Sequence, residues 1–263
     1  TRSSCCPRRA ASRAAPSDEG FWVAVLPFKH RGAHADLEAL ADGLDEDIVM
    51  GLMRFSHLRV VSRGSTRRFS GEAADIRTVG RELGARYVIE GSVRQAGGAV
   101  RIAVQLVDTG SGAQLWAETF DRPFSPESVF ELQDALAHRI VSTVADAHGV
   151  LPHTLSEALR SRNLDELSPY ETVLRSFGFW ERLTAEEFAT TLASLERAVQ
   201  QAPGYSYAWA MLSLILGTQH YYGFDGQPDP LGRALKAARK AVDLDPSSHR
   251  AHQALAETLF WRK

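Results

Sequence analysis

Four carboxylates crowd into one short stretch of the sequence, at Asp42, Asp45, Glu46 and Asp47. Clustered carboxylate oxygens can bind a divalent cation, but a hard cation needs ligands that converge on one point. The apolar residues around them recur with helical spacing, and neighbours on a helix point in different directions. We therefore favour a solvated helix face over a metal site.

Five arginines follow in the next part of the sequence and could form an anion-binding pocket. Such a pocket would lie near the ends of the first two predicted strands, where open α/β sheets often bind ligands. An exposed basic patch with no ligand is the alternative that we favour. The five residues are Arg63, Arg67, Arg68, Arg77 and Arg81.

Sequence motifs for catalysis are absent from the chain. It contains no His-Glu-x-x-His and no Gly-x-Ser-x-Gly, and the glycines of residues 109–112 precede no helix and no Gly-Lys-Ser/Thr. His249 and His252 are one helical turn apart, but no third or fourth metal ligand accompanies them, so packing is the better interpretation. We assign no catalytic, cofactor-binding or metal-binding residue, and we expect no cofactor and no enzymatic activity from this chain.

Aromatic residues are concentrated in the second half of the chain, and most of them should lie in its core. Tyr221, Tyr222 and Phe224 differ, because they begin a segment rich in glycine, aspartate and proline that reads as a loop. Loops carry binding residues, and aromatic side chains are frequent at the centre of interfaces. These three residues are our candidates for contact with a partner.

Residues 1–20 are rich in arginine, alanine, serine and proline, and we expect them to be a disordered linker. They contain both cysteines of the chain, Cys5 and Cys6. Adjacent thiols can neither staple a fold nor complete a zinc site without distant partners. Lipidation beside a membrane anchor is the alternative reading of this basic segment.

Composition limits the remaining possibilities. The chain has 263 residues, 44% of them hydrophobic and 24% charged, and its formal net charge is −2. This is enough apolar material for two ordinary cores, and the charge gives no global field to hold nucleic acid. No window is apolar enough to span a membrane, and no signal peptide is recognisable at the N-terminus.

Apolar periodicity predicts an α/β domain over residues 21–150. The run at residues 21–28 reads as a buried strand, and Gly97-Gly98 and residues 109–112 read as hairpin turns between three alternating segments. We expect a mixed sheet, covered by helices on the face that contains Val100, Ile102, Val104 and Leu106. The other expected strands are 58–62, 87–94, 100–107 and 114–120, and the expected helices are 37–55, 75–83 and 125–148.

The last part of the sequence repeats itself. Ala198, Pro203 and Trp209 recur 43 residues later as Ala241, Pro246 and His252. A fixed offset of this kind indicates stacked helical repeats. After a linker at 151–167, we expect an all-α region of tetratricopeptide type over 168–263. Its expected helices are 170–182, 185–202, 206–220 and 231–244, with a loop of 221–230 inserted in the second unit and a third unit from 249 that stops before its second helix.

The first domain also resembles a known family through several motifs in the same order. They are Val-Ala-Val-Leu-Pro-Phe at 23–28, Ala-Asp-Gly-Leu-Asp-Glu-Asp-Ile at 41–48, the segment 80–94 beginning Gly-Arg-Glu-Leu-Gly, and the segment 104–118 containing Asp-Thr-Gly-Ser-Gly. Residues 21–150 resemble the TolB-like N-terminal domain of bacterial multidomain signalling proteins. The resemblance implies a position between an effector and tetratricopeptide repeats, the effector being a nucleotidyl cyclase, a serine/threonine kinase or a CadC-like DNA-binding regulator. It brings no catalytic motif with it.

We therefore expect a non-catalytic regulatory or scaffold segment of a bacterial signalling protein, which binds a protein or peptide through its repeats. The alternative is a domain that senses a ligand and controls an attached adenylate or guanylate cyclase, a kinase or a DNA-binding regulator. We expect no nucleic acid binding by this segment, further repeats and an effector elsewhere in a longer protein, and self-association through the uncovered last helix. The expected compartment is the cytoplasm, or the periplasm if a membrane anchor precedes the chain.

Overall fold

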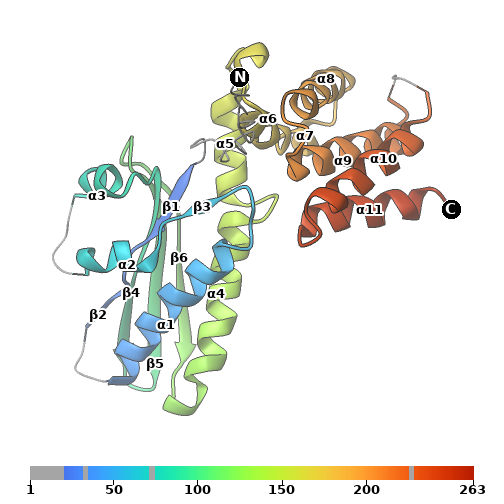
Figure 1. Cartoon of the computed structure of the whole chain (residues 1–263). Helices are drawn as coiled ribbons and strands as arrows, with labels where there is room; N and C mark the ends of the chain where they lie inside the picture. Colours follow the sequence, from blue (N-terminus) through green and yellow to red (C-terminus); the bar gives the residue numbers. More distant parts are fainter. Residues whose placement is uncertain (1–20, 32–34, 71–74, 225–227) are drawn as a thin grey trace, which may run out of the picture.

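The computed structural model describes residues 21–31, 35–70, 75–224 and 228–263. An α/β part comes first and a helical part follows, and the two lie side by side with α4 and α5 between them (Figure 1). The predicted tail at 1–20, with Cys5 and Cys6, lies outside the described residues. The predicted order of an α/β region followed by a helical region is confirmed.

The α/β part is built on a mixed sheet, as predicted, but the described sheet has six strands and only five were expected. Its strands follow the order β3-β1-β4-β5-β6, and β2 also pairs with β4. β1 runs parallel to β3 and to β4, whereas β4, β5 and β6 form an antiparallel meander. The strands are β1 (Trp22–Val25), β2 (Lys29–Arg31), β3 (Arg59–Val60), β4 (Tyr87–Ala96), β5 (Ala99–Asp108) and β6 (Gln114–Pro123).

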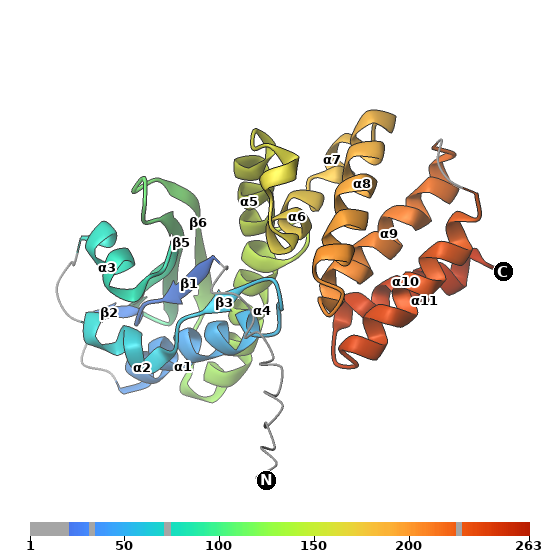
Figure 2. The same ribbon diagram turned by 45° about the horizontal axis from the view of Figure 1, so that its top comes forward.

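Helices α1 (Ala35–Leu52) and α4 (Val129–Ala145) cover one face of the sheet. The alternating residues of β5 point toward them, and Val100, Ile102, Val104 and Leu106 are all at most 2% exposed. Helix α3 (Ile76–Leu83) lies on the other side (Figure 2), where it forms a second, smaller core with Phe69 of the short helix η1 (Arg67–Phe69). The short helix α2 (Arg63–Thr66) directly precedes η1. The short helix η2 (Pro126–Ser128) leads into α4.

Local sequence signals fix several of these boundaries. The Asp75 side chain accepts a hydrogen bond from the Thr78 amide and so begins α3, and Gly84 ends that helix at a φ of 63°. Gly97 has a φ of 59° in the turn between β4 and β5, which is a conformation that favours glycine. The predicted helix at 125–148 ends earlier than expected, because α4 stops at Ala145.

The helical part differs from the prediction near its start. Residues 151–167, predicted as a linker, contain the helix α5 and the short helix η3, because Leu151, Leu155 and Leu159 form a buried stripe. The single helix predicted at 170–182 is divided into α6 and α7 around Gly178, which packs against Ser156. The elements are α5 (Val150–Arg160), η3 (Leu164–Glu166), α6 (Pro169–Ser176), α7 (Phe179–Arg182), α8 (Ala185–Gln201), α9 (Ser206–Tyr222), α10 (Pro230–Leu244) and α11 (His249–Trp261).

Two residue pairs that recur in the sequence make matching contacts in the structure. Trp209 Nε1 donates a hydrogen bond to the carbonyl oxygen of Pro203 at 2.9 Å, and His252 Nε2 lies 2.8 Å from the carbonyl oxygen of Pro246. The two pairs occupy equivalent positions at the starts of α9 and α11. The preceding helices α8 and α10 therefore end in the same way, and each leads through a proline-containing turn into the next helix.

Candidate partner-binding surface

The last turns of α9 and α11 lie at the end of the helical part that is far from the sheet (Figure 1). They carry a cluster of four exposed aromatic side chains. We call Tyr221, Tyr222, Phe260 and Trp261 the aromatic surface. The ring centroids of Tyr221 and Trp261 are 5.0 Å apart, so the two side chains connect the last turns of α9 and α11. Phe260 is 62% exposed and Tyr221 59% exposed. Contiguous exposed apolar surface of this kind is typical of interaction sites.

A small pocket of about 140 Å³ opens between α9 and α11 beside the aromatic surface. Trp180 of α7, Tyr221 of α9 and Trp261 of α11 are among the residues that line it. Ser213 donates a hydrogen bond to the Ala234 carbonyl oxygen at 2.9 Å and lies 3.2 Å from the Thr258 hydroxyl, so it fixes α9, α10 and α11 to one another. The pocket is smaller than a typical small-molecule site, and its size suits a single apolar side chain.

The three aromatic residues singled out from the sequence have different environments. Tyr221 and Tyr222 lie in the last turn of α9, so their predicted position in a loop at 221–230 is wrong. Both are exposed, and their binding of a partner stays a prediction. Phe224 is half-buried instead, because its ring stacks on Phe188 of α8 at 5.1 Å. Leu259, Phe260 and Trp261 of α11 are exposed, as expected from the sequence.

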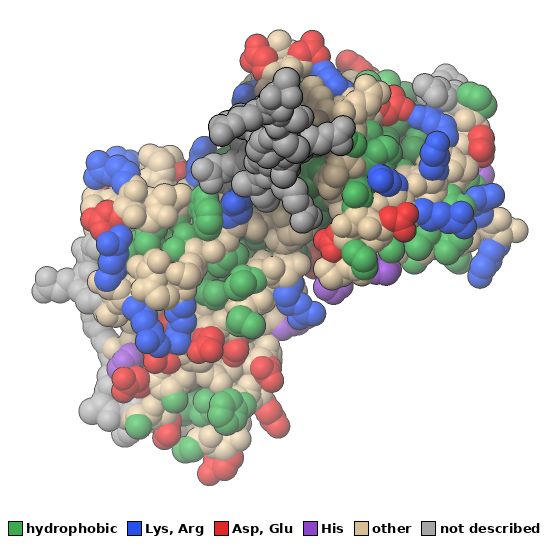
Figure 3. All heavy atoms as spheres, viewed as in Figure 1, with side chains coloured by type: hydrophobic (Ala, Val, Ile, Leu, Met, Phe, Trp, Pro, Cys, Tyr) green, Lys and Arg blue, Asp and Glu red, His purple; other side chains and the backbone are tan. Residues whose placement is uncertain are grey.

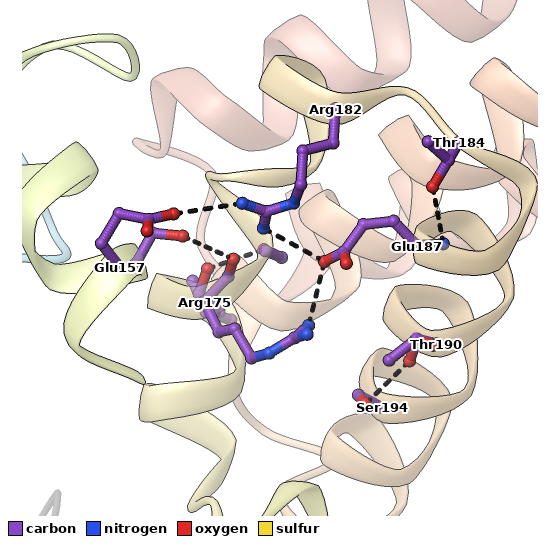
Figure 4. A network of polar contacts seen from close by, with 10 residues as sticks. Glu157, Arg175, Arg182, Thr184, Glu187, Thr190 and Ser194 are labelled. Carbon is purple, nitrogen blue, oxygen red and sulfur yellow. Dashed lines mark hydrogen bonds and ion pairs between the residues drawn. The ribbon is translucent and has the colours of Figure 1, made fainter. Parts of the chain in front are cut away.

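A network of ion pairs connects the region of α7, the helix that carries Trp180, to neighbouring helices (Figure 4). Glu187 of α8 lies 3.3 Å from both Arg175 and Arg182, and Arg182 reaches Glu157 of α5 at 3.1 Å. The Arg175 side chain is only 8% exposed and that of Glu187 only 14%. Because these charged groups are shielded from water, each needs its ion-pair partner to compensate for the lost hydration. The network fixes α5, α6, α7 and α8 relative to one another.

His57 connects the two parts of the molecule, and sequence reasoning did not single it out. It lies between α1 and β3, and its ring is 5.2 Å from Phe177 and 5.8 Å from Tyr207 of the helical part. The Tyr170 hydroxyl donates a hydrogen bond to the His57 carbonyl oxygen at 2.7 Å. His57 is 2% exposed, and burial lowers its pKa to about 3. The imidazole is therefore neutral near pH 7.

The acidic cluster and one of the arginines contact each other. Arg63 Nε lies 2.5 Å from Asp45 Oδ1, and Arg63 Nη1 lies 2.9 Å from Glu46 Oε2. Asp45 is 2% exposed, so the expectation of a wholly solvated acidic face is wrong at this residue. Burial raises the pKa of Asp45, while the Arg63 guanidinium opposes that shift. Throughout the described residues, no three His, Cys, Asp or Glu side chains are grouped as metal ligands.

The remaining arginines of the predicted anion pocket reach separate partners. Arg68 pairs with Glu82 at 3.3 Å. Arg77 donates a hydrogen bond to the Ser111 carbonyl oxygen at 2.7 Å, and Arg81 donates one to the Thr78 hydroxyl at 3.0 Å. Arg67 is exposed. Anion binding by these residues stays a prediction.

Comparison with known proteins gives matches of two kinds. The family model of the HilA/YgeH-like transcriptional regulator, second domain, matches residues 19–139. A protein of Rhizobium meliloti (strain 1021) named putative adenylate cyclase 3 is 35% identical to the chain over 244 residues. That alignment covers 92% of this chain and 40% of the relative, so the chain spans less than half the length of the relative.

Solved structures with a similar arrangement are more distant. The PelC dodecamer from Paraburkholderia phytofirmans is 20% identical, with a TM-score of 0.34 over 47% of this chain and 86% of that one. TolB from Acinetobacter baumannii is 17% identical, with a TM-score of 0.32 over 49% and 30%. The LpoB C-terminal domain from Escherichia coli is 18% identical, with a TM-score of 0.31 over 40% and 84%. In the described part of the chain, no helix is long and apolar enough to cross a membrane.

Proposed function

We propose that the chain is a regulatory segment of a signalling protein and that its helical part binds a partner polypeptide at the aromatic surface. The contact between Tyr221 and Trp261 beside the pocket carries this proposal. Tyr221 comes from α9 and Trp261 from α11, and both residues line, together with Trp180, a hollow whose size fits one side chain. Aromatic residues beside such a pocket are typical binding hot spots.

We also propose that the helical part is of tetratricopeptide type. Small residues at helix crossings and a proline after the second helix are the requirements of that repeat. Ala198 and Ala241 are at most 1% exposed, and Pro203 and Pro246 follow their helices. The matched hydrogen bonds of Trp209 and His252 support the same assignment. Repeats of this kind present stacked helices to a bound polypeptide.

The proposed signalling role draws on the two sequence comparisons, because one relative is named as an adenylate cyclase and the matching family model describes transcriptional regulators. We propose that the chain itself is not catalytic and that the effector lies in another part of a longer protein. The identity of that effector, cyclase or DNA-binding, follows from neither match. The ligand-sensing alternative finds less support, because Arg63, Arg68, Arg77 and Arg81 contact different partners.

Peptide display on the full 263-residue chain tests the proposed surface. Peptides selected on the wild-type chain should carry an apolar side chain, and the double variant Tyr221→Ala with Trp261→Ala should weaken their binding by about tenfold or more. Phe130→Ala is the matched control, because Phe130 is 80% exposed but belongs to the α/β part. Equal binding by the double variant would exclude the aromatic surface as the site.

A further inference from the structure

A second surface of the helical part, a groove along the outer side of α10, is strongly basic. Lys236, Arg239 and Lys240 line it together with Arg262, which follows α11. All four side chains are exposed, and the groove measures about 660 Å³. Lys and Arg side chains gather over α10 and the end of α11 in the space-filling view (Figure 3). We call this feature the basic groove.

The positive charge of the basic groove is poorly compensated by the chain itself. Among the described residues, Asp243 is the single acidic residue that lines the groove, and none of them forms an ion pair with Lys236, Arg239 or Lys240. Arg233 on the same helix differs, because it pairs with Glu196 of α8. Four cations held close together without partners repel one another, and an anionic ligand would relieve that repulsion.

The floor of the basic groove is apolar. Leu235 is 8% exposed, and the indole of Trp209 is half-buried beside it. Lys236, Arg239 and Lys240 recur at helical spacing and so form one stripe along α10. The lining residues of α10 run from Gly232 to Asp243, which corresponds to about 16 Å along the helix axis. A ligand that matches this surface is elongated and combines negative charges with apolar groups.

We propose that the basic groove binds an acidic amphipathic helix of a partner polypeptide. Carboxylates three and four residues apart on such a helix would face the cations of α10, and its apolar residues would contact Leu235 and Trp209. Nucleic acid fits less well, because its phosphate backbone offers negative charge but no aliphatic face that would match Leu235 and Trp209. An anionic membrane fits less well too, because the apolar residues lie at the floor of the groove and do not protrude.

The inference rests on the proposed polypeptide-binding role, but it uses a separate surface. The basic groove and the aromatic pocket have no lining residue in common. Variants of the two surfaces therefore distinguish the two proposals. If substitution of Tyr221 and Trp261 weakens the binding of display-selected peptides, the first proposal is supported. If substitution of the cations of α10 weakens the binding of an acidic helix, the second proposal is supported.

The test uses the full chain and a synthetic peptide of about 15 residues, the length of α10. Glutamates form one stripe of the peptide helix and leucines the adjacent stripe, and a scrambled peptide of the same composition is the first control. Binding is measured by fluorescence anisotropy at low and high salt. The triple variant Lys236→Glu, Arg239→Glu and Lys240→Glu should raise the Kd by at least about tenfold. Added salt should weaken wild-type binding.

The matched control is Lys29→Glu with Arg54→Glu and Arg94→Glu, which changes the net charge equally at exposed sites of the α/β part and should keep the wild-type Kd. The neutral variant Lys236→Gln, Arg239→Gln and Lys240→Gln should give an intermediate Kd, and circular dichroism verifies that each variant is folded. Equal binding of the scrambled peptide, or of the reversed variant, would overturn the proposal. The proposal would also be overturned if the double variant Tyr221→Ala with Trp261→Ala no longer bound the acidic peptide. Stronger binding of oligothymidylate or of phosphatidylserine vesicles than of the peptide would overturn it too.

Discussion

His57 shows how one buried side chain links the two parts of the molecule. Its ring lies among Phe55, Phe177 and Tyr207, and its carbonyl oxygen accepts a hydrogen bond from Tyr170. The guanidinium of Arg250 lies 5.9 Å from the Tyr207 ring and adds positive charge nearby. Burial, and to a smaller extent Arg250, lower the pKa of His57 from its ordinary 6.5 to about 3. Protonation of this imidazole is therefore coupled to unfolding.

The first prediction concerns the stability of the protein in mild acid. Because the folded pKa of His57 is lower than the unfolded pKa, the unfolded state binds more protons below pH 6.5, and stability falls as the pH decreases toward 3. Between about pH 6.5 and about pH 4.5 the histidine should contribute a loss of about 2 kcal/mol. His57→Phe should remove that part of the pH dependence in urea unfolding measurements. Identical pH profiles for the two proteins would contradict the assignment.

For single residues at the candidate site, the sequence predicts which side chains are exposed better than it predicts which distant residues of the chain they contact. Tyr221 and Tyr222 could be identified because they adjoin a segment rich in glycine and proline. The burial of Phe224 could not, because its stacking partner Phe188 lies on another helix, 36 residues earlier in the chain. His57 gave no signal either, since a lone histidine before a short strand looks like any surface residue until the helical part packs on it.

At the scale of elements, the sequence predicts a helix or strand correctly where the signals that define it lie within its own residues. β5 alternates strictly, and α3 has its own cap and stop, so both agree with the prediction. β2 could not be predicted, because Lys29–Arg31 is short and polar and is defined by its pairing with β4. Gly80 of α3 packs closely against Thr109, since a Cβ at Gly80 would lie 2.3 Å from the Thr109 side chain.

Glu187 provides the prediction at the scale of elements. Glu187→Ala leaves the buried Arg175 guanidinium without its carboxylate, so the free energy of unfolding should fall by about 3 kcal/mol. Glu186→Ala is the matched control, because Glu186 lies in the same first turn of α8 but is exposed. Both variants lose a similar favourable interaction with the helix dipole, so the difference between their losses in free energy of unfolding measures the contribution of the ion-pair network. Urea unfolding curves measure both values, and equal losses would exclude a structural role for the network.

The whole molecule has one large core that extends across both parts. A single cluster of buried residues contains Val23 of β1, Leu174 of α6 and Ala254 of α11. The α/β part and the helical part lie side by side with α4 and α5 between them (Figure 2). The segment around His57 contacts Tyr170, Phe177 and Tyr207 of the helical part. The sequence predicted two regions separated by a linker, and it gave no sign of the shared core, because contacts between distant segments leave no local pattern. This arrangement allows the helical part to affect the α/β part through packing.

The shared core predicts that the two parts unfold together. In differential scanning calorimetry the wild-type chain should show one transition, with a calorimetric enthalpy close to its van't Hoff enthalpy. The double variant Phe21→Ala with His57→Ala removes two side chains of the α/β part that contact Tyr170, Phe177 and Tyr207, and the cavities should cost about 3 kcal/mol or more. Its transition should broaden or divide, whereas Met53→Ala with Phe130→Ala, which changes exposed residues, should keep a single transition. Two transitions in the wild-type chain would mean that packing at His57 does not couple the parts, and any signal received by the helical part would then need another route to the sheet.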